Sequence, residues 1–115
     1  MSRASDKETL GLPREATDLR GASIEIIGGP SLGAKVDARR EKIVIGSAEG
    51  NDLVLDDPTV SRFHCEIELT RDRATVRDLG SKNGTLVDRV AVLSAVLHEG
   101  AVLTLGSSTL RFGRT

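Results

Sequence analysis

Residues 61–85 read SRFHCEIELTRDRATVRDLGSKNGT, and this stretch decides the fold. Between its two ends, residues 64–70 and 74–79 alternate apolar and polar side chains, with three charged residues between them. Strict alternation is typical of a strand with one buried face, so the two segments predict a β-hairpin with a polar tip. The loops that flank a hairpin end at the same edge of a sheet. We therefore expect residues 61–64 and 81–85 to lie side by side.

The two flanking loops carry residue types that bind an anion. Ser61 and Arg62 belong to the first loop, and Lys82 and Asn83 stand directly before Gly84 in the second. Hydroxyl, amide and cationic groups, together with main-chain N–H groups beside a glycine, donate charge-assisted hydrogen bonds worth about 1.5–3 kcal/mol each to a phosphate. The loops predict a phosphate-recognising binding site and not an enzyme.

Outside the hairpin, the chain from Ala22 consists of short apolar runs separated by Gly, Pro, Asp and Asn. This spacing predicts an all-β sandwich, and no segment has a helical period. The further strands are expected at residues 22–28, 33–38, 42–46, 53–55, 85–88, 90–93, 101–105 and 109–113. We expect residues 1–21 to form a disordered polar tail and residues 22–115 to form one domain.

Length and composition narrow the class of protein. The 115 residues suffice for one domain, and its core must be aliphatic because Phe63 and Phe112 are the only aromatic residues. A net charge of -1 and the lack of aromatic platforms argue against nucleic-acid binding. Cys65 is the single cysteine and alternates with apolar residues, which predicts a buried thiol. No signal sequence and no apolar run of about 18 residues is present, so we expect a cytoplasmic protein with no membrane contact.

Two glycine-containing loops have more than one interpretation. Residues 46–52, GSAEGND, lack the lysine of a P-loop, so they form either a plain connection or a loop in which Ser47 adds a hydroxyl to the anion site. Residues 82–85 contain Asn-Gly, a strong hairpin signal, so a plain turn is the alternative there. The amide of Asn83 can also bind the main chain of an extended peptide.

His64 and Asp78 suggest a hydrolase triad with Ser61, but no nucleophile elbow or strand-to-helix turn accompanies them. We expect no catalysis, and instead expect the ring nitrogens of His64 to hold the Ser61 loop. The histidines and Cys65 lack metal-ligand spacing, so neither a metal nor a cofactor is expected.

A set of short motifs runs through the chain: IG at 45–46, NDLVL at 51–55, VSRFHC at 60–65, DLGSKNGT at 78–85, LTLG at 103–106 and LRF at 110–112. With these motifs the chain resembles a forkhead-associated (FHA) domain over residues 24–113. The Ser-x-x-His followed at hairpin distance by Asn-Gly is the specific part. The resemblance implies a two-sheet β-sandwich of about eleven strands that binds phosphothreonine peptides in loops at one end.

The resemblance also implies roles for single residues. Ser61 would hydrogen-bond the phosphate, and Arg62 and Lys82 would flank the phosphothreonine. Asn83 would hold the peptide main chain beside it. The residues that would shape the loops are Gly46, His64 and Gly84.

Ser47 departs from the family pattern, which usually has a phosphate-binding arginine directly after the first glycine. Loss of that ionic hydrogen bond predicts weaker binding by about ten- to a hundredfold. Binding would then depend on other bases, such as Arg62, Lys82 or Arg39.

The body of the chain, with serine in place of that arginine, is similar to the N-terminal modules of bacterial enhancer-binding transcription activators. This implies a signalling module that regulates an attached effector domain, with a phosphothreonine-containing protein or peptide, such as a Ser/Thr kinase substrate, as partner. The alternative is a phosphate-independent interaction or autoinhibitory module that docks on its own effector domain or on another copy of itself. Ser47 favours this alternative.

Overall fold

The expected hairpin is present as β6 (Cys65–Leu69) and β7 (Ala74–Asp78), which pair antiparallel. It lies at the centre of a computed structural model that describes residues 21–115. The hairpin turns without a glycine, because the hydroxyl of Thr70 accepts the main-chain N–H groups of Asp72 and Arg73. Hydroxyl groups can replace a main-chain turn in this way, so the charged tip needs no special residue.

Eleven strands form two sheets in the described part of the chain, and no helix accompanies them. The five-stranded sheet has the order β10-β7-β6-β4-β5 and adds β4 (Lys42–Gly46), β5 (Leu53–Val54) and β10 (Ser94–Leu97) to the hairpin. The six-stranded sheet has the order β3-β2-β12-β11-β8-β9, with β2 (Ala22–Gly28), β3 (Lys35–Ala38), β8 (Thr85–Val87), β9 (Val90–Val92), β11 (Val102–Leu105) and β12 (Ser108–Arg114). The two-sheet, all-β prediction is confirmed.

The core between the sheets is aliphatic, as the composition predicts. Ile45 and Ile67 of one sheet and Ile24 and Leu103 of the other are fully buried, and Phe112 is the single core aromatic. Each such side chain contributes about 1.5–3 kcal/mol by leaving water. Cys65 is buried too, and this burial, with the neighbouring Asp78 carboxylate, raises the pKa of its thiol to about 12.

The strand predicted at residues 90–93 is present as β9 (Val90–Val92), but the sequence analysis predicts no strand at residues 94–97, where β10 forms. The chain forms β9 on the six-stranded sheet, crosses at Leu93, and pairs with β7 as β10. The run VAVLSAVL contains no glycine, proline or charge to mark this crossing.

The interpretation of Asn83-Gly84 as a plain hairpin tip is also wrong. β7 and β8 belong to different sheets, so this loop carries the chain from one sheet to the other. A two-residue hairpin turn lies instead between β8 and β9, where Asp88 and Arg89 have φ values of 49° and 73°. Positive φ at both central residues is the geometry of a type I′ turn, which usually selects Asn-Gly.

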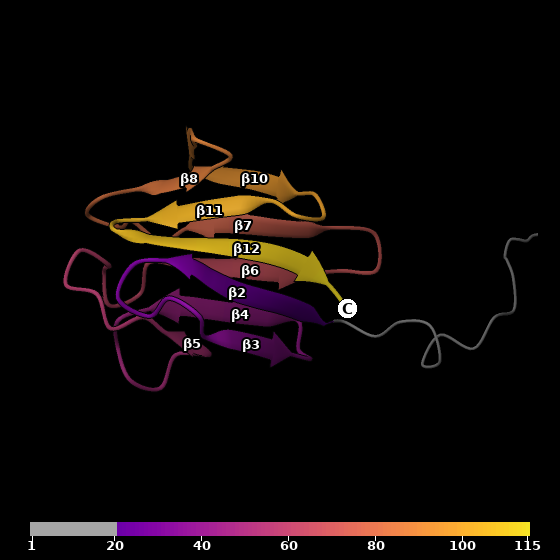
Figure 1. The fold of residues 1–115 in the computed structure, drawn as a ribbon. Coiled ribbons are helices and arrows are strands. Elements are labelled where there is room, and N and C mark those ends of the chain that lie inside the picture. Colours follow the sequence, from indigo (N-terminus) through magenta and orange to yellow (C-terminus); the bar gives the residue numbers. More distant parts are fainter. Residues whose placement is uncertain (1–20) are drawn as a thin grey trace, which may run out of the picture.

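The loops that follow β4, precede β6 and follow β7 gather at one end of the sandwich, at the left in Figure 1, and the C-terminus lies at the other end. Strand direction produces this grouping, because β4 and β7 both run antiparallel to β6. Residues 21–115 contain no helix that is long and apolar enough to cross a membrane. The expected disordered tail lies outside the described residues, except for Gly21.

Candidate phosphate-binding loops

His64 connects the two loops on either side of the hairpin. Its ring is fully buried, Nδ1 accepts the main-chain N–H of Ser61 at 3.1 Å, and Nε2 donates to the Gly84 carbonyl at 2.8 Å. A carbonyl can only accept and an N–H can only donate, so the ring carries its proton on Nε2. Both ring nitrogens are therefore engaged, and neither can serve as a base for the Ser61 hydroxyl.

Ser61 stands where the three loops meet. Its Oγ accepts the main-chain N–H of Lys82 at 2.9 Å, and its carbonyl accepts the main-chain N–H of Ser47 at 3.0 Å. The side chain is only partly buried, so the hydroxyl proton can still be donated to a ligand. The sequence-predicted proximity of residues 61–64 and 81–85 is confirmed by these contacts.

The loop after β4 packs directly against Arg62. The main-chain N–H of Ala48 and the side-chain amide of Asn51 both donate to the Arg62 carbonyl, at 3.2 and 2.7 Å. A Cβ at Gly46 would come within 2.1 Å of the same carbonyl oxygen. Only glycine fits there, so Gly46 permits the contact that positions Ser47 beside Ser61.

Asp78 organises the loop that carries Lys82 and Asn83. Oδ2 accepts the main-chain N–H groups of Gly80 and Ser81 at 2.9 and 3.0 Å. Oδ1 accepts the hydroxyls of Ser81 and Thr85 at 2.5 and 2.8 Å. Burial raises the pKa of Asp78, but the combined effect of these hydrogen bonds is larger and in the opposite direction. The pKa of Asp78 therefore lies below its ordinary value. The carboxylate therefore stays ionised and holds the loop in one shape.

Asn83 contacts the loop that precedes Ser61. Its side-chain amide nitrogen donates to the Thr59 carbonyl at 2.8 Å, and the residue is otherwise exposed. The amide oxygen faces no recorded donor among residues 21–115, so it remains able to accept from a peptide N–H. The neighbouring Gly84 has a φ of 83° and donates its N–H to Ser81 Oγ at 2.9 Å.

Asp57 lies beneath the same loops and is 3% exposed. It accepts the N–H and hydroxyl of Thr59 at 2.8 and 2.6 Å and the hydroxyl of Ser108 at 2.7 Å. Hydrogen bonds from Thr59 and then Ser108 hold the pKa of Asp57 below its ordinary value, although burial raises it. Because Ser108 belongs to β12, Asp57 joins the Thr59 loop to the six-stranded sheet.

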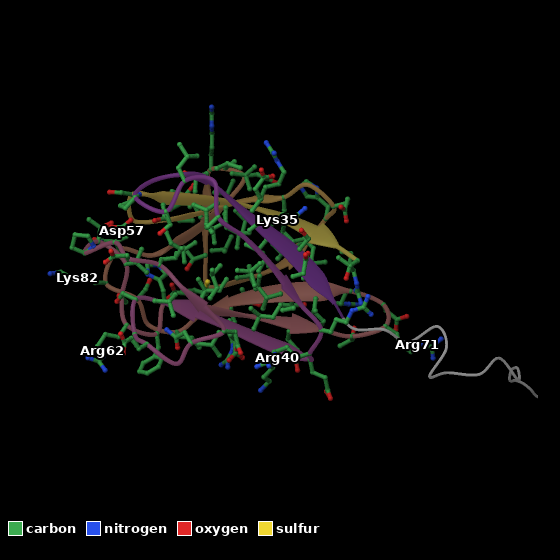
Figure 2. The ribbon with its side chains drawn as sticks, turned by 60° about the horizontal axis from the view of Figure 1, so that its bottom comes forward. Lys35, Arg40, Asp57, Arg62, Arg71 and Lys82 are labelled. Atoms are coloured by element: carbon green, nitrogen blue, oxygen red, sulfur yellow. The ribbon has the colours of Figure 1, made fainter. Side chains whose placement is uncertain are left out.

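Two cationic side chains extend from this end of the molecule. Figure 2 shows Arg62 and Lys82 reaching outward from the loops, while Arg71 lies at the opposite end, at the tip of the β6–β7 hairpin. Both residues are exposed. The expectation that Arg39 could replace the missing arginine is wrong, because Arg39 follows β3 and its side chain lies beside the position of Gly21, far along the sandwich from Ser61.

The structure thus brings the sequence-predicted residues of three loops to one end: Ser47, Ser61, Arg62, Lys82 and Asn83, with Gly46, His64 and Gly84 beneath them. The sequence analysis assigns no role in the site to Asp57, Asp78 or Asn51. Asp57 and Asp78 accept hydrogen bonds from main-chain N–H groups two or three residues later in the chain, which is the spacing of an Asx turn. Asn51 has no such signal, because its acceptor is eleven residues away.

Comparison with known proteins supports the family resemblance that the sequence motifs indicate. The family model described as FHA domain matches residues 43–106, which is more than half of the chain. The oxoglutarate dehydrogenase inhibitor of Corynebacterium jeikeium is 35% identical over 109 residues, covering 95% of this chain and 72% of that protein. The glycogen accumulation regulator GarA of Mycobacterium tuberculosis is 39% identical over 84 residues, covering 73% of this chain and 52% of its own length.

Solved structures agree with the family model. A structure from work on phosphothreonine-dependent FHA domain interactions superposes with a TM-score of 0.74 at 29% identity, covering 81% of this chain and 95% of that one. The FhaA FHA domain, solved in complex with the intracellular domain of Rv3910, gives a TM-score of 0.72 at 30% identity, with coverage of 79% and 98%.

Proposed function

This chain belongs to the FHA domain family of phosphothreonine-binding interaction modules, and we propose that its Ser61, Arg62 and Lys82 loops bind a phosphothreonine segment of a signalling partner. One observation carries the proposal. The hydrogen bond from Lys82 N–H to Ser61 Oγ joins the two loops that carry this hydroxyl and two exposed cations, Arg62 and Lys82, and the two hydrogen bonds of His64 hold the same loops together. A phosphate carries about -1.5 to -2 charges at neutral pH, and this set matches its charge and acceptor oxygens.

In the proposed complex the Ser61 hydroxyl donates a hydrogen bond to a phosphate oxygen, while its oxygen still accepts the hydrogen bond from the Lys82 N–H. Arg62 and Lys82 supply the opposing charge. Asn83 accepts a main-chain N–H of the bound peptide through its amide oxygen and keeps its bond to Thr59. The rigid loops reduce the conformational entropy that is lost on binding, so the site is preorganised for an extended peptide. The module binds and positions its partner, and no covalent step is assigned to it.

The test is isothermal titration calorimetry of the chain with a degenerate phosphothreonine peptide library and its unphosphorylated twin. Binding only of the phosphorylated library is expected. Ser61→Ala should weaken it by about ten- to a hundredfold, the effect of losing one hydrogen bond to a charged group. Ser23→Ala, on β2 of the other sheet, is the matched control and should leave the affinity unchanged. Equal binding of both libraries would contradict the proposal.

Ser47 supports a second candidate function, a phosphate-independent docking or autoinhibitory module. Its side chain is partly buried and uncharged at the position where the family usually has arginine. A loop surface without that cation could contact protein directly, either an attached effector domain or another copy. In this case the unphosphorylated partner would bind as tightly as the phosphorylated one.

The relatives support a regulatory role for the module. They are named as an inhibitor of oxoglutarate dehydrogenase and a regulator of glycogen accumulation. For this chain we propose regulation of an attached effector, with a bacterial transcription activator as the candidate and the cytoplasm as its location.

A further inference from the structure

One edge strand of each sheet lies on the same side of the sandwich, and these two neighbouring strands carry no charged residue. β9 closes the six-stranded sheet and β10 closes the five-stranded sheet, and only Leu93 separates them in the chain. Figure 1 shows β10 near the top of the molecule. Residues 90–97, VAVLSAVL, contain no charge, proline or glycine, although 29% of the chain is charged. Leu93, Val90 and Val96 are 83%, 61% and 57% exposed. This run will be called the apolar edge.

The opposite edges are protected against pairing with another strand. β3 exposes Lys35 and Asp37, and β5 is only two residues long, with Asp56 two residues beyond its end. Charged residues and very short strands are the usual devices that keep a sheet edge from joining a second sheet. The apolar edge has no charge, so its exposed face differs in kind from the other edges of the same molecule.

The main chain of β10 also has groups that point away from its own sheet. Asp78 donates its N–H to the Leu93 carbonyl at 2.9 Å, so Leu93 and Asp78 form a hydrogen-bonded pair. Pairs alternate along an antiparallel ladder, and Ala95 opposite Val76 is therefore bonded in the same way. The N–H and C=O groups of the residues between these pairs, Ser94 and Val96, point to the outer edge. No described residue pairs with them.

We propose that this edge binds a second copy of the chain, with β10 pairing antiparallel to β10 of the partner copy around a twofold axis. If Ser94 of one copy lies opposite Val96 of the other, the two outward residues of each strand exchange main-chain hydrogen bonds. Ala95 then lies on the axis, where its small side chain permits close approach. The two five-stranded sheets become one continuous sheet.

The chemistry of the edge selects a second copy as the occupant. A twofold contact places the same surface patch on both sides, so the patch must tolerate itself. Residues 90–97 do, because pairing them buries neither a like-charge contact nor an unpaired charge. Val90 and Leu93 flank the shared strands and would lose exposed apolar area on pairing. The contact is small, so we expect a dimer that dissociates on dilution.

The arrangement separates the two phosphate-binding ends. Antiparallel pairing of β10 reverses the direction of the partner copy, and the Ser61 loops of the two copies then lie at opposite ends of the joined sheet. The dimer would display two proposed phosphate-binding sites, one from each copy, and its formation does not require phosphate binding.

The test is sedimentation equilibrium of the 115-residue chain over a wide concentration range, on the unmodified protein and on Val96→Pro. Proline removes only the Val96 N–H, which does not bond to β7, and prolines are tolerated at such edge positions. We expect concentration-dependent dimers for the unmodified chain and a dimer dissociation constant raised by about tenfold or more in Val96→Pro.

Val96→Thr keeps the N–H and the branched side chain and should dimerise normally. Val96→Lys adds a charge to the edge without constraining the main chain, and it should abolish the dimer even if the proline variant folds poorly. Val54→Lys, on the far edge strand of the same sheet, is the control and should have no effect. A chain that remains monomeric at every concentration, or a dimer that Val96→Lys leaves intact, would overturn the proposal. Phosphopeptide titration of the same variants reports on the other site separately.

Discussion

Ser47 is the residue whose chemistry most affects the strength of the proposed phosphate site. Its main-chain N–H donates to the Ser61 carbonyl, so a longer side chain at this position would start close to the Ser61 hydroxyl that we propose as a phosphate ligand. Ser47→Arg should tighten phosphopeptide binding by about ten- to a hundredfold through one added ionic hydrogen bond. The gain should shrink as salt rises, because part of it is Coulombic.

Calorimetry at two salt concentrations checks this prediction, with Ser47→Gln as a control of similar length and no charge. If the arginine variant binds phosphopeptide no better than the glutamine variant, the proposed place of the phosphate is wrong.

His64 should act through the loops and not through the ligand. His64→Ala removes both ring hydrogen bonds and leaves the Ser61 N–H and the Gly84 carbonyl without their partners in a partly buried site. Each unsatisfied group costs about 1–3 kcal/mol, so the melting temperature should fall by several degrees and binding should weaken while the sandwich persists. Thermal unfolding followed by circular dichroism measures this. His98→Ala, at an exposed histidine paired with Asp88, should change stability far less, and equal effects at both histidines would contradict the argument.

At the scale of the element, the loop between β7 and β8 depends on the carboxylate that precedes it. Asp78→Asn keeps the shape of the side chain but replaces one acceptor oxygen with a donor that faces N–H and hydroxyl groups. We expect the loop to loosen and phosphopeptide affinity to fall by about tenfold, because hydrogen bonds to a charged group are lost.

Amide hydrogen exchange of Gly80 and Ser81 should accelerate in the same variant. Asp72→Asn, at the tip of β6–β7, is the matched control, and it should alter neither exchange in this loop nor binding. Unchanged protection at Ser81 would show that other contacts hold the loop.

At the scale of the whole molecule, Asp57 and Asp78 make the free energy of unfolding depend on pH. Both carboxyl groups have a folded-state pKa below the ordinary value of 3.8, so each stabilises the folded chain above that value. This stability is lost as pH falls through the folded pKa values, because protonation removes the charge that the hydrogen bonds favour. We expect the melting temperature to fall steeply below about pH 4.

Asp57→Asn should lower the melting temperature at neutral pH and flatten the acid dependence, because the protonation-linked group is gone. Asp56→Asn, at the exposed neighbour, should leave the curve unchanged. A wild-type curve that is flat down to pH about 3 would contradict the role of these carboxylates.

Local patterns in the sequence determined most of the architecture. The alternation in residues 64–79 specified the hairpin, since side chains of a strand point to opposite faces and only one face can be buried. A hairpin returns the chain to the edge where it began, so the proximity of Ser61 and Lys82 also followed from sequence. The aliphatic composition similarly specified the core.

Only the tertiary structure decided the features that depend on residues far apart in the chain. It placed β10 on the other sheet from β9, because the crossing at Leu93 is driven by pairing with β7 and not by a turn residue. Arg39 lies beside Gly21 and far from the loops, and Asp57 accepts a hydrogen bond from Ser108, which is fifty-one residues away in the chain. Such contacts arise where two sheets pack together, and a local pattern does not record which distant partner a side chain meets.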